Sequence, residues 1–60
     1  MYAEITHEAF YRLKTDNAIL LEIEQLEHAV KYYYVEHGVA LLKIEQPTSQ
    51  AQYFIQDINS

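Results

Sequence analysis

The histidines are the first residues whose chemistry needs testing, because imidazole is both a metal ligand and an acid–base group near neutral pH. The chain has three of them, His7, His28 and His37. His28 follows Glu24 by four residues, which would place both side chains on one face of a helix. A metal site needs further ligands from elsewhere, and the spacing offers none. We therefore predict no metal ion and expect all three histidines to be ordinary surface residues.

The carboxylates of Glu22, Glu24 and Glu27 are the next candidates, as general acids or bases. Such a role needs burial or a charged neighbour that moves the pKa towards neutrality, whereas these side chains have the pattern of a solvated edge. The chain has no cysteine, and its single glycine leaves no phosphate-binding loop. The sequence therefore predicts no catalytic residue, no cofactor and no enzymatic activity.

The tyrosines carry more information. There are six of them in 60 residues, and Tyr32, Tyr33 and Tyr34 are contiguous. Adjacent residues point in different directions in both helices and strands, so these three rings cannot all be buried together. Tyrosine is favoured at protein interfaces because its side chain is large, stiff and amphipathic. Part of this set is therefore expected to contact another protein.

Size and charge narrow the class of protein. We expect a single domain over residues 1–60, and a domain of this size buries too little surface to be very stable alone. Half of its residues are hydrophobic, so some apolar surface should remain as an interface. The net charge of −5 argues against nucleic-acid partners, and no apolar run is long enough for a membrane partner. The opening residues lack the positive charge of a signal peptide, so we expect a cytoplasmic protein.

Residues 18–37 decide the fold, and two interpretations compete for them. Asp16 or Asn17 can cap the start of a helix there, and Gly38 suits its end. Apolar residues recur at steps of four and three, which is the period of an amphipathic helix. They are Ile19, Ile23, Leu26, Val30 and Tyr33. This pattern favours one helix over about 18–37.

The rival interpretation is a β-hairpin. The hexapeptide LLEIEQ at 20–25 recurs as LLKIEQ at 41–46, which indicates a weak internal duplication. The chain would then be an all-β meander of six short strands, or a small barrel. The second copy has a good turn at Pro47-Thr48-Ser49, but the first copy has Leu26-Glu27-His28 at that place. Because a hairpin would expose Leu26, we favour the helix.

The flanking segments are predicted to form two hairpins. Residues 39–45 and 51–58 have the pattern of strands and are joined through Pro47. A four-residue loop would set Leu42 opposite Tyr53. Residues 2–6 and 9–15 would form the other hairpin, and a short helix over 7–14, capped by Thr6, is the alternative.

The expected fold is therefore α+β, with two β-hairpins flanking one amphipathic helix (ββαββ) on a four-stranded antiparallel or mixed sheet. One helix covers only one face of such a sheet, so aromatic and aliphatic residues on the other face should remain bare. The candidate interface residues are Tyr2, Phe10, Tyr33, Leu41 and Phe54.

These observations predict a small acidic protein–protein interaction module, homo-oligomeric, with a structural or regulatory role. Its partner would be a second copy of the chain or another protein. The alternative is a small inhibitor, antitoxin or phage-type regulator that occupies a partner protein and imitates nucleic acid with its negative charge.

Overall fold

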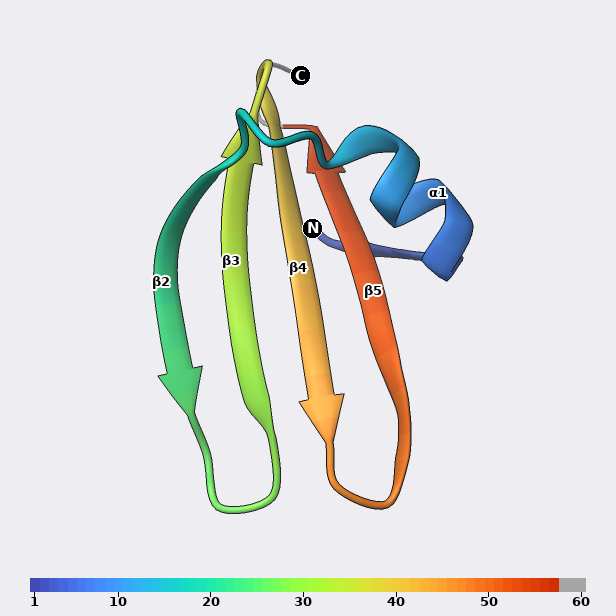
Figure 1. Cartoon of the computed structure of the whole chain (residues 1–60), viewed down its shortest axis with the longest axis vertical. Helices are drawn as coiled ribbons and strands as arrows, with labels where there is room; N and C mark the ends of the chain where they lie inside the picture. Colours follow the sequence, from blue (N-terminus) through green and yellow to red (C-terminus); the bar gives the residue numbers. More distant parts are fainter. Residues whose placement is uncertain (58–60) are drawn as a thin grey trace.

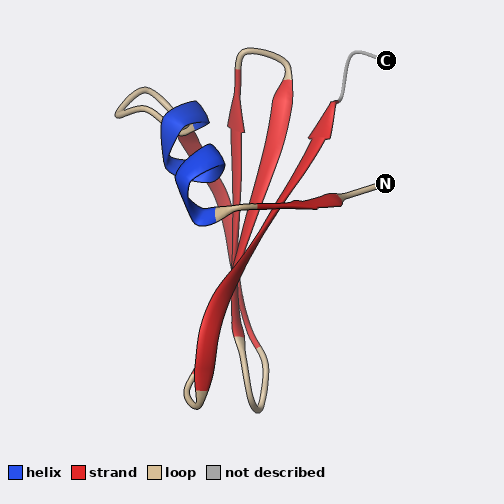
Figure 2. Cartoon of the chain, turned by 90° about the vertical axis from the view of Figure 1, so that its right-hand side faces the viewer, coloured by secondary structure: helices blue, strands red, loops and turns tan. Residues whose placement is uncertain are grey.

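The described part of the chain forms a single twisted sheet with one short helix on one face (Figures 1 and 2). The structure is a computed structural model that describes residues 1–57. In chain order its elements are β1 (Ala3–Ile5), α1 (His7–Leu13), β2 (Ile19–Gln25), β3 (Val30–Glu36), β4 (Val39–Gln46) and β5 (Ser49–Asp57). The strand order is β1-β5-β4-β3-β2, and every neighbouring pair in it is antiparallel. β2 to β5 thus form a meander, and β1 pairs with the outer side of β5.

The predicted helix over 18–37 is wrong, because this segment is the hairpin of β2 and β3. The ββαββ arrangement on a four-stranded sheet is therefore wrong as well, and the all-β alternative fits better, with five strands in place of six. β3 lies between β2 and β4 and pairs on both sides, an environment that suits its aromatic and β-branched residues. Pairing within the sheet thus overrides the helical period of the apolar residues.

The turn of this hairpin explains why the sequence favoured a helix. A hydrogen bond of 2.8 Å from the amide of Leu26 to the carbonyl of Ala29 closes the turn around Glu27 and His28. None of these residues is a typical turn former. The exposure that argued against a hairpin is present in the structure, since Leu26 is 47% exposed.

The N-terminal segment folds as the alternative short helix and not as a hairpin. Thr6 caps α1, since its Oγ1 accepts a hydrogen bond of 3.0 Å from the amide of Ala9. Glu8 in the first turn and Arg12 in the last turn suit the helix dipole. The predicted pairing of 2–6 with 9–15 is therefore wrong, and β1 pairs with β5 instead.

β4 and β5 confirm the two predicted C-terminal strands, although position 58 lies outside the described residues. Their register differs from the prediction by one residue, because Leu42 lies opposite Phe54 and not opposite Tyr53. The cause is an irregularity between Ile44 and Gln46, since an extra residue in one strand shifts all later pairs. A shift of one residue moves side chains to the other face and so changes which of them reach the core.

The core lies between α1 and the middle of the sheet. Phe10 and Leu41 are 0% and 1% exposed, and Tyr53 packs against them. We call this side of the sheet the α1 face, and we call the other side, which carries Leu42 and Phe54, the opposite face. Partly buried side chains on the α1 face complete the cluster: Ile5, Tyr34, Val39, Ala51 and Ile55.

Candidate functional site

The outer side of β2, called here the β2 edge (Ile19–Gln25), stands out on the surface of the described chain. This strand is last in the sheet order, so it pairs with β3 on one side only. An edge strand presents a row of amide and carbonyl groups with which another strand can pair. Four of its seven residues are also large, apolar and exposed: Ile19 at 61%, Leu20 at 46%, Leu21 at 64% and Ile23 at 49%.

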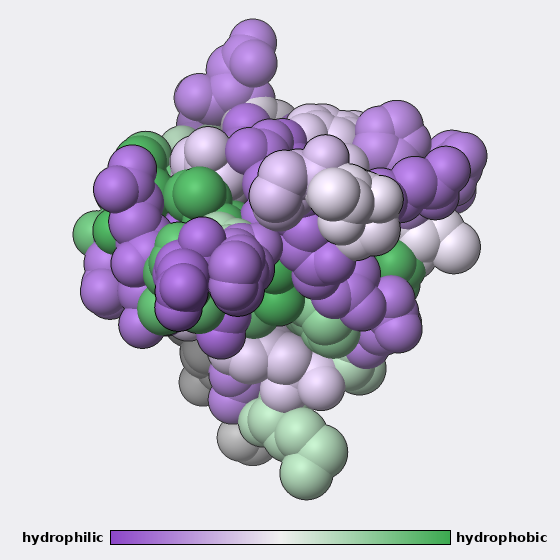
Figure 3. Space-filling model, turned by 90° about the horizontal axis from the view of Figure 1, so that it is seen from below, coloured by the Kyte–Doolittle hydropathy of each residue, from purple (hydrophilic) through white to green (hydrophobic). Residues whose placement is uncertain are grey.

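Leu20 and Ile23 are exposed because α1 is too short and too distant to cover them, whereas Ile19 pairs with Val35 and lies on the face of the sheet that α1 does not cover. α1 has seven residues and packs on β5, whereas β2 forms the other side of the sheet (Figure 1). Seen from below, hydrophobic side chains reach the surface on the left, the side on which Figure 1 places β2 (Figure 3). Apolar surface that the fold leaves uncovered is typical of a protein-interaction site.

The β2 edge is apolar towards the α1 face. Leu20 lies opposite Tyr34, which contacts the core, and Ile23 lies opposite Tyr32. Leu21 is the extra residue of a β-bulge between them. A partner on this side would meet aliphatic side chains.

The β2 edge is acidic towards the opposite face. Glu22 lies opposite Tyr33, and Glu24 lies opposite Lys31. The Tyr33 hydroxyl donates a hydrogen bond of 3.1 Å to Glu24, and burial together with this hydrogen bond raises the pKa of Tyr33. Within residues 1–57 neither glutamate forms an ion pair, although Lys31 is the cross-strand neighbour of Glu24.

The structure separates the five residues that the sequence proposed as an interface. Phe10 and Leu41 lie in the core, which corrects their expected position on a bare face of the sheet. The cause is the folding of 7–13 as a helix, because α1 carries Phe10 onto Leu41. Neither side chain has surface left for a partner of the folded chain.

The other three candidates lie on the opposite face. Tyr33 and Phe54 are half-buried and flank Leu42, which is 7% exposed. Tyr2 is half-buried too and lies near enough to Tyr33 to influence its pKa. A contact through these residues stays a prediction.

Sequence reasoning missed the β2 edge because Ile19 and Ile23 were assigned to the buried stripe of a helix. One signal could have found it. LLKIEQ at 41–46 lies almost entirely within the predicted strand 39–45, and the nearly identical LLEIEQ at 20–25 has the same strand pattern. That comparison predicts the strand correctly, although it does not predict that the strand lies at an edge.

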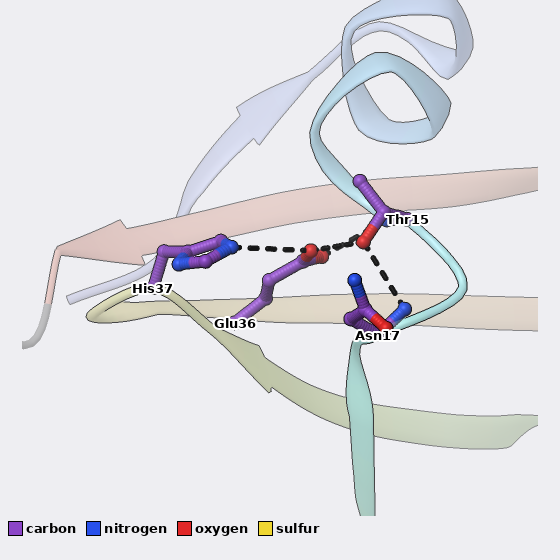
Figure 4. A network of polar contacts seen from close by, with 4 residues as sticks. All are labelled: Thr15, Asn17, Glu36 and His37. Carbon is purple, nitrogen blue, oxygen red and sulfur yellow. Dashed lines mark hydrogen bonds and ion pairs between the residues drawn. The ribbon is translucent and has the colours of Figure 1, made fainter.

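A buried glutamate ties the segment before β2 to the end of β3 (Figure 4). Glu36 is 7% exposed and accepts hydrogen bonds from the hydroxyl of Thr15 and, at 2.9 Å, from its amide. The Thr15 hydroxyl oxygen also accepts a hydrogen bond of 3.1 Å from the amide of Asn17, and His37 Nε2 lies 3.7 Å from Glu36. The two bonds from Thr15 lower the pKa of Glu36. This network holds the point at which the chain enters β2, which is a structural role.

Lys43 joins α1 to the sheet. Its Nζ donates a hydrogen bond of 3.1 Å to the Tyr11 hydroxyl and lies 2.9 Å from a carboxylate oxygen of Glu45. It also lies 5.9 Å and 5.6 Å from the ring centroids of Tyr11 and Tyr32. Burial opposes its charge, but the hydrogen bonds to Glu45 and Tyr11 outweigh burial and raise the pKa of Lys43. A lysine held in its charged form is neither a nucleophile nor a base at neutral pH.

Each of the three histidines contacts different residues. His7 packs its ring against Tyr11, with centroids 4.9 Å apart, while His28 and His37 each lie 3.7 Å from the glutamate before them. Within residues 1–57, no three side chains of the metal-binding types come together. A depression of about 410 Å³ beside α1 is lined by His7, Glu8, Gln50, Ala51 and Tyr53.

No family model, curated protein or solved structure matches this chain. In the part of the chain that the structure describes, no helix has the length and apolar character needed to cross a membrane. The β2 edge must therefore be interpreted from its own geometry and chemistry.

Proposed function

We propose that this protein is a small acidic interaction module that binds another protein chain, a second copy included, by adding a strand to the β2 edge. The observation that carries the proposal is the exposure of four large apolar side chains on a strand whose outer side is unpaired in the described chain. Strand addition accounts for both features, since backbone groups pair while side chains become covered. The role is structural or regulatory, without a catalytic step or a cofactor.

The stabilisation expected from self-association is modest. Full burial of a leucine or isoleucine contributes about 1.5–3 kcal/mol, and the side chains of the β2 edge are already near half-buried, which leaves roughly 1 kcal/mol each. Association opposes this with several kcal/mol of lost translational and rotational freedom. Two copies should therefore bind weakly, with a Kd on the order of 0.1 mM.

Sedimentation velocity over a range of protein concentrations tests the proposal. The chain should associate as its concentration approaches about 0.5 mM, and Leu21→Lys should abolish that association by placing a charge in the contact. Leu13→Lys is the matched control, because Leu13 is 43% exposed but lies on α1. If the chain and both variants sediment alike, self-association through β2 is contradicted.

A further inference from the structure

We propose that the best occupant of the β2 edge is an extended segment of another protein with apolar side chains on one side and lysine or arginine on the other. The inference rests on the proposed function, because it names the partner of the same edge. The apolar side of the segment would cover Leu20, Leu21 and Ile23. Its cationic side would meet Glu22 and Glu24 on the opposite face.

β3 shows how a strand that fits β2 is built, since it is the neighbour that β2 already has. On the α1 face β3 sets Tyr32 and Tyr34 against the aliphatic side chains of β2. On the opposite face it sets Lys31 against Glu24. Cross-strand pairs of apolar residues and of opposite charges stabilise a sheet. A second neighbour on the outer side would follow the same pattern for the same reasons.

β4 repeats the sequence of β2 with one informative difference. Lys43 in LLKIEQ stands where LLEIEQ has Glu22, and Glu45 stands where it has Glu24. The two side chains of β4 form an ion pair, with Lys43 Nζ 2.9 Å from a Glu45 oxygen. The central strand thus neutralises its own charge. The edge strand has no lysine of its own, and its two glutamates form no ion pair inside the described chain, so a partner can add positive charge beside them.

A second copy of the chain supplies the wrong charge for this edge. Antiparallel pairing of two β2 strands across a two-fold axis keeps the two opposite faces on one side of the joint sheet. Glu22 and Glu24 of both copies then share that side, and like charges across neighbouring strands destabilise the pairing. The net charge of −5 on each copy adds to the repulsion. A cationic strand should therefore bind more tightly than a second copy.

The far edge of the sheet does not compete for the same occupant. β1 already pairs with the outer side of β5 at three positions, from Tyr53 to Ile55. Residues 49–56 of β5 also carry no charged side chain that would attract lysine or arginine. The terminal strand at this edge, β1, has three residues and one charged side chain, Glu4, so the two edges of the described sheet differ in length and in charge.

Titration of the full chain with two short capped peptides tests the inference. One peptide alternates lysine with valine, and the other alternates glutamate with valine, so they differ only in charge. Backbone amide chemical shifts report the position of binding, and their concentration dependence reports the affinity. The lysine peptide should shift the amides of β2 (Ile19–Gln25), and it should bind about tenfold more tightly than the glutamate peptide, because two charge pairs are formed and none is repulsive.

Two variants with the same change in charge provide the control. Glu22→Gln combined with Glu24→Gln should lower the affinity for the lysine peptide about tenfold and remove the preference between the peptides. Glu4→Gln combined with Glu8→Gln removes two exposed glutamates elsewhere and should leave the preference intact.

The remaining outcomes overturn the inference, and they differ in what they mean for the proposed function. Equal binding of the two peptides, or binding that leaves the β2 amides unshifted, overturns it. If neither peptide binds while the chain still self-associates in a manner that Leu21→Lys abolishes, the occupant is a second copy and the proposed function stands. If neither peptide binds and the chain also remains a monomer, the inference and the proposed function both fail.

Discussion

β2 and β4 carry almost the same hexapeptide, yet its leucines are exposed in β2 and buried in β4. The two leucines of LLKIEQ in β4, Leu41 and Leu42, are 1% and 7% exposed. The two leucines of LLEIEQ in β2, Leu20 and Leu21, are 46% and 64% exposed. The difference cannot come from the local sequence, because these residues are identical. It comes from strand order, since β4 has a neighbour on each side and β2 has one.

The two strands also differ in what their apolar residues contact. In β4, α1 closes over Leu41 through Phe10, and the hexapeptide becomes part of the core. In β2, the same apolar residues stay exposed, and we propose that another chain covers them. The two strands also differ in charge at one equivalent position, which is Lys43 in β4 and Glu22 in β2. Of the two, only β4 therefore contains a positive charge that pairs with its own glutamate, Glu45.

The largest expected effect comes from removing equivalent leucines from the two strands. Leu41→Ala should lower the free energy of unfolding by about 2–5 kcal/mol, because it leaves a cavity beneath Phe10. Leu20→Ala should lower it by less than about 1 kcal/mol, because that side chain is half-exposed. Urea unfolding followed by circular dichroism measures both. Equal losses for the two variants would contradict the assignment of β4 to the core and of β2 to the edge.

A smaller effect is expected at the junction that leads into β2. Thr15→Ala removes the hydroxyl that donates to Glu36 and accepts from Asn17, so the free energy of unfolding should fall by about 1–2 kcal/mol. Thr48→Ala changes the same type of side chain in the exposed turn between β4 and β5 and is the control. A loss of equal size in both variants would mean that the network does not hold the entry to β2.

The hydrogen bonds between Thr15 and Glu36 should also make the stability of the fold depend on pH in the acidic range. Glu36 has a lowered pKa in the folded chain, so its contribution is complete above the unfolded value of 4.5 and is lost as the pH falls through the folded value. The thermal midpoint should therefore drop more steeply below pH 4.5 in the native chain than in Glu36→Gln. Glu8→Gln, an exposed position on α1, should keep the steeper fall. Parallel curves for the native chain and Glu36→Gln would count against the role of the buried carboxylate.

The C-terminal half of the fold could be predicted because its signals are local. Pro47 marks a turn between two strand-like segments, and both strands form there. The cap at Thr6 likewise predicts α1, although only as an alternative to a hairpin. The hairpin of β2 and β3 could not be predicted with the same rules, since Leu26, Glu27 and His28 form its turn without a favourable turn residue.

The β2 edge could not be predicted from local sequence patterns, for a different reason. Whether Leu20 and Leu21 are buried depends on the order of strands in the sheet, and that order is a property of the whole chain. The register shift near Ile44, which places Leu41 and not Leu42 on the side of the sheet that carries Tyr53, depends on the same long-range pairing. The expectation of surplus apolar surface followed from composition, but its location on one strand required the structure.

The smallest change in stability is expected from making β2 resemble β4 in charge. Glu22→Lys places a cation two residues before Glu24, as Lys43 precedes Glu45, and an exposed pair of this kind should change the free energy of unfolding by less than about 1 kcal/mol. Self-association should become several-fold tighter, because the repulsion between copies falls. Glu8→Lys makes the same change of net charge on α1 and is the control. Equal effects of both variants in sedimentation would show that net charge, and not the β2 edge, governs association.

We propose that other protein chains add to the outer side of β2. Amide hydrogen exchange, followed residue by residue at low and at high protein concentration, tests this claim most directly. We expect protection to rise with concentration at the amides of Ile19–Gln25 that face away from β3, while the rates in β5 stay unchanged. Association of the chain without any rise in protection in β2, or with the rise confined to another strand, would contradict it.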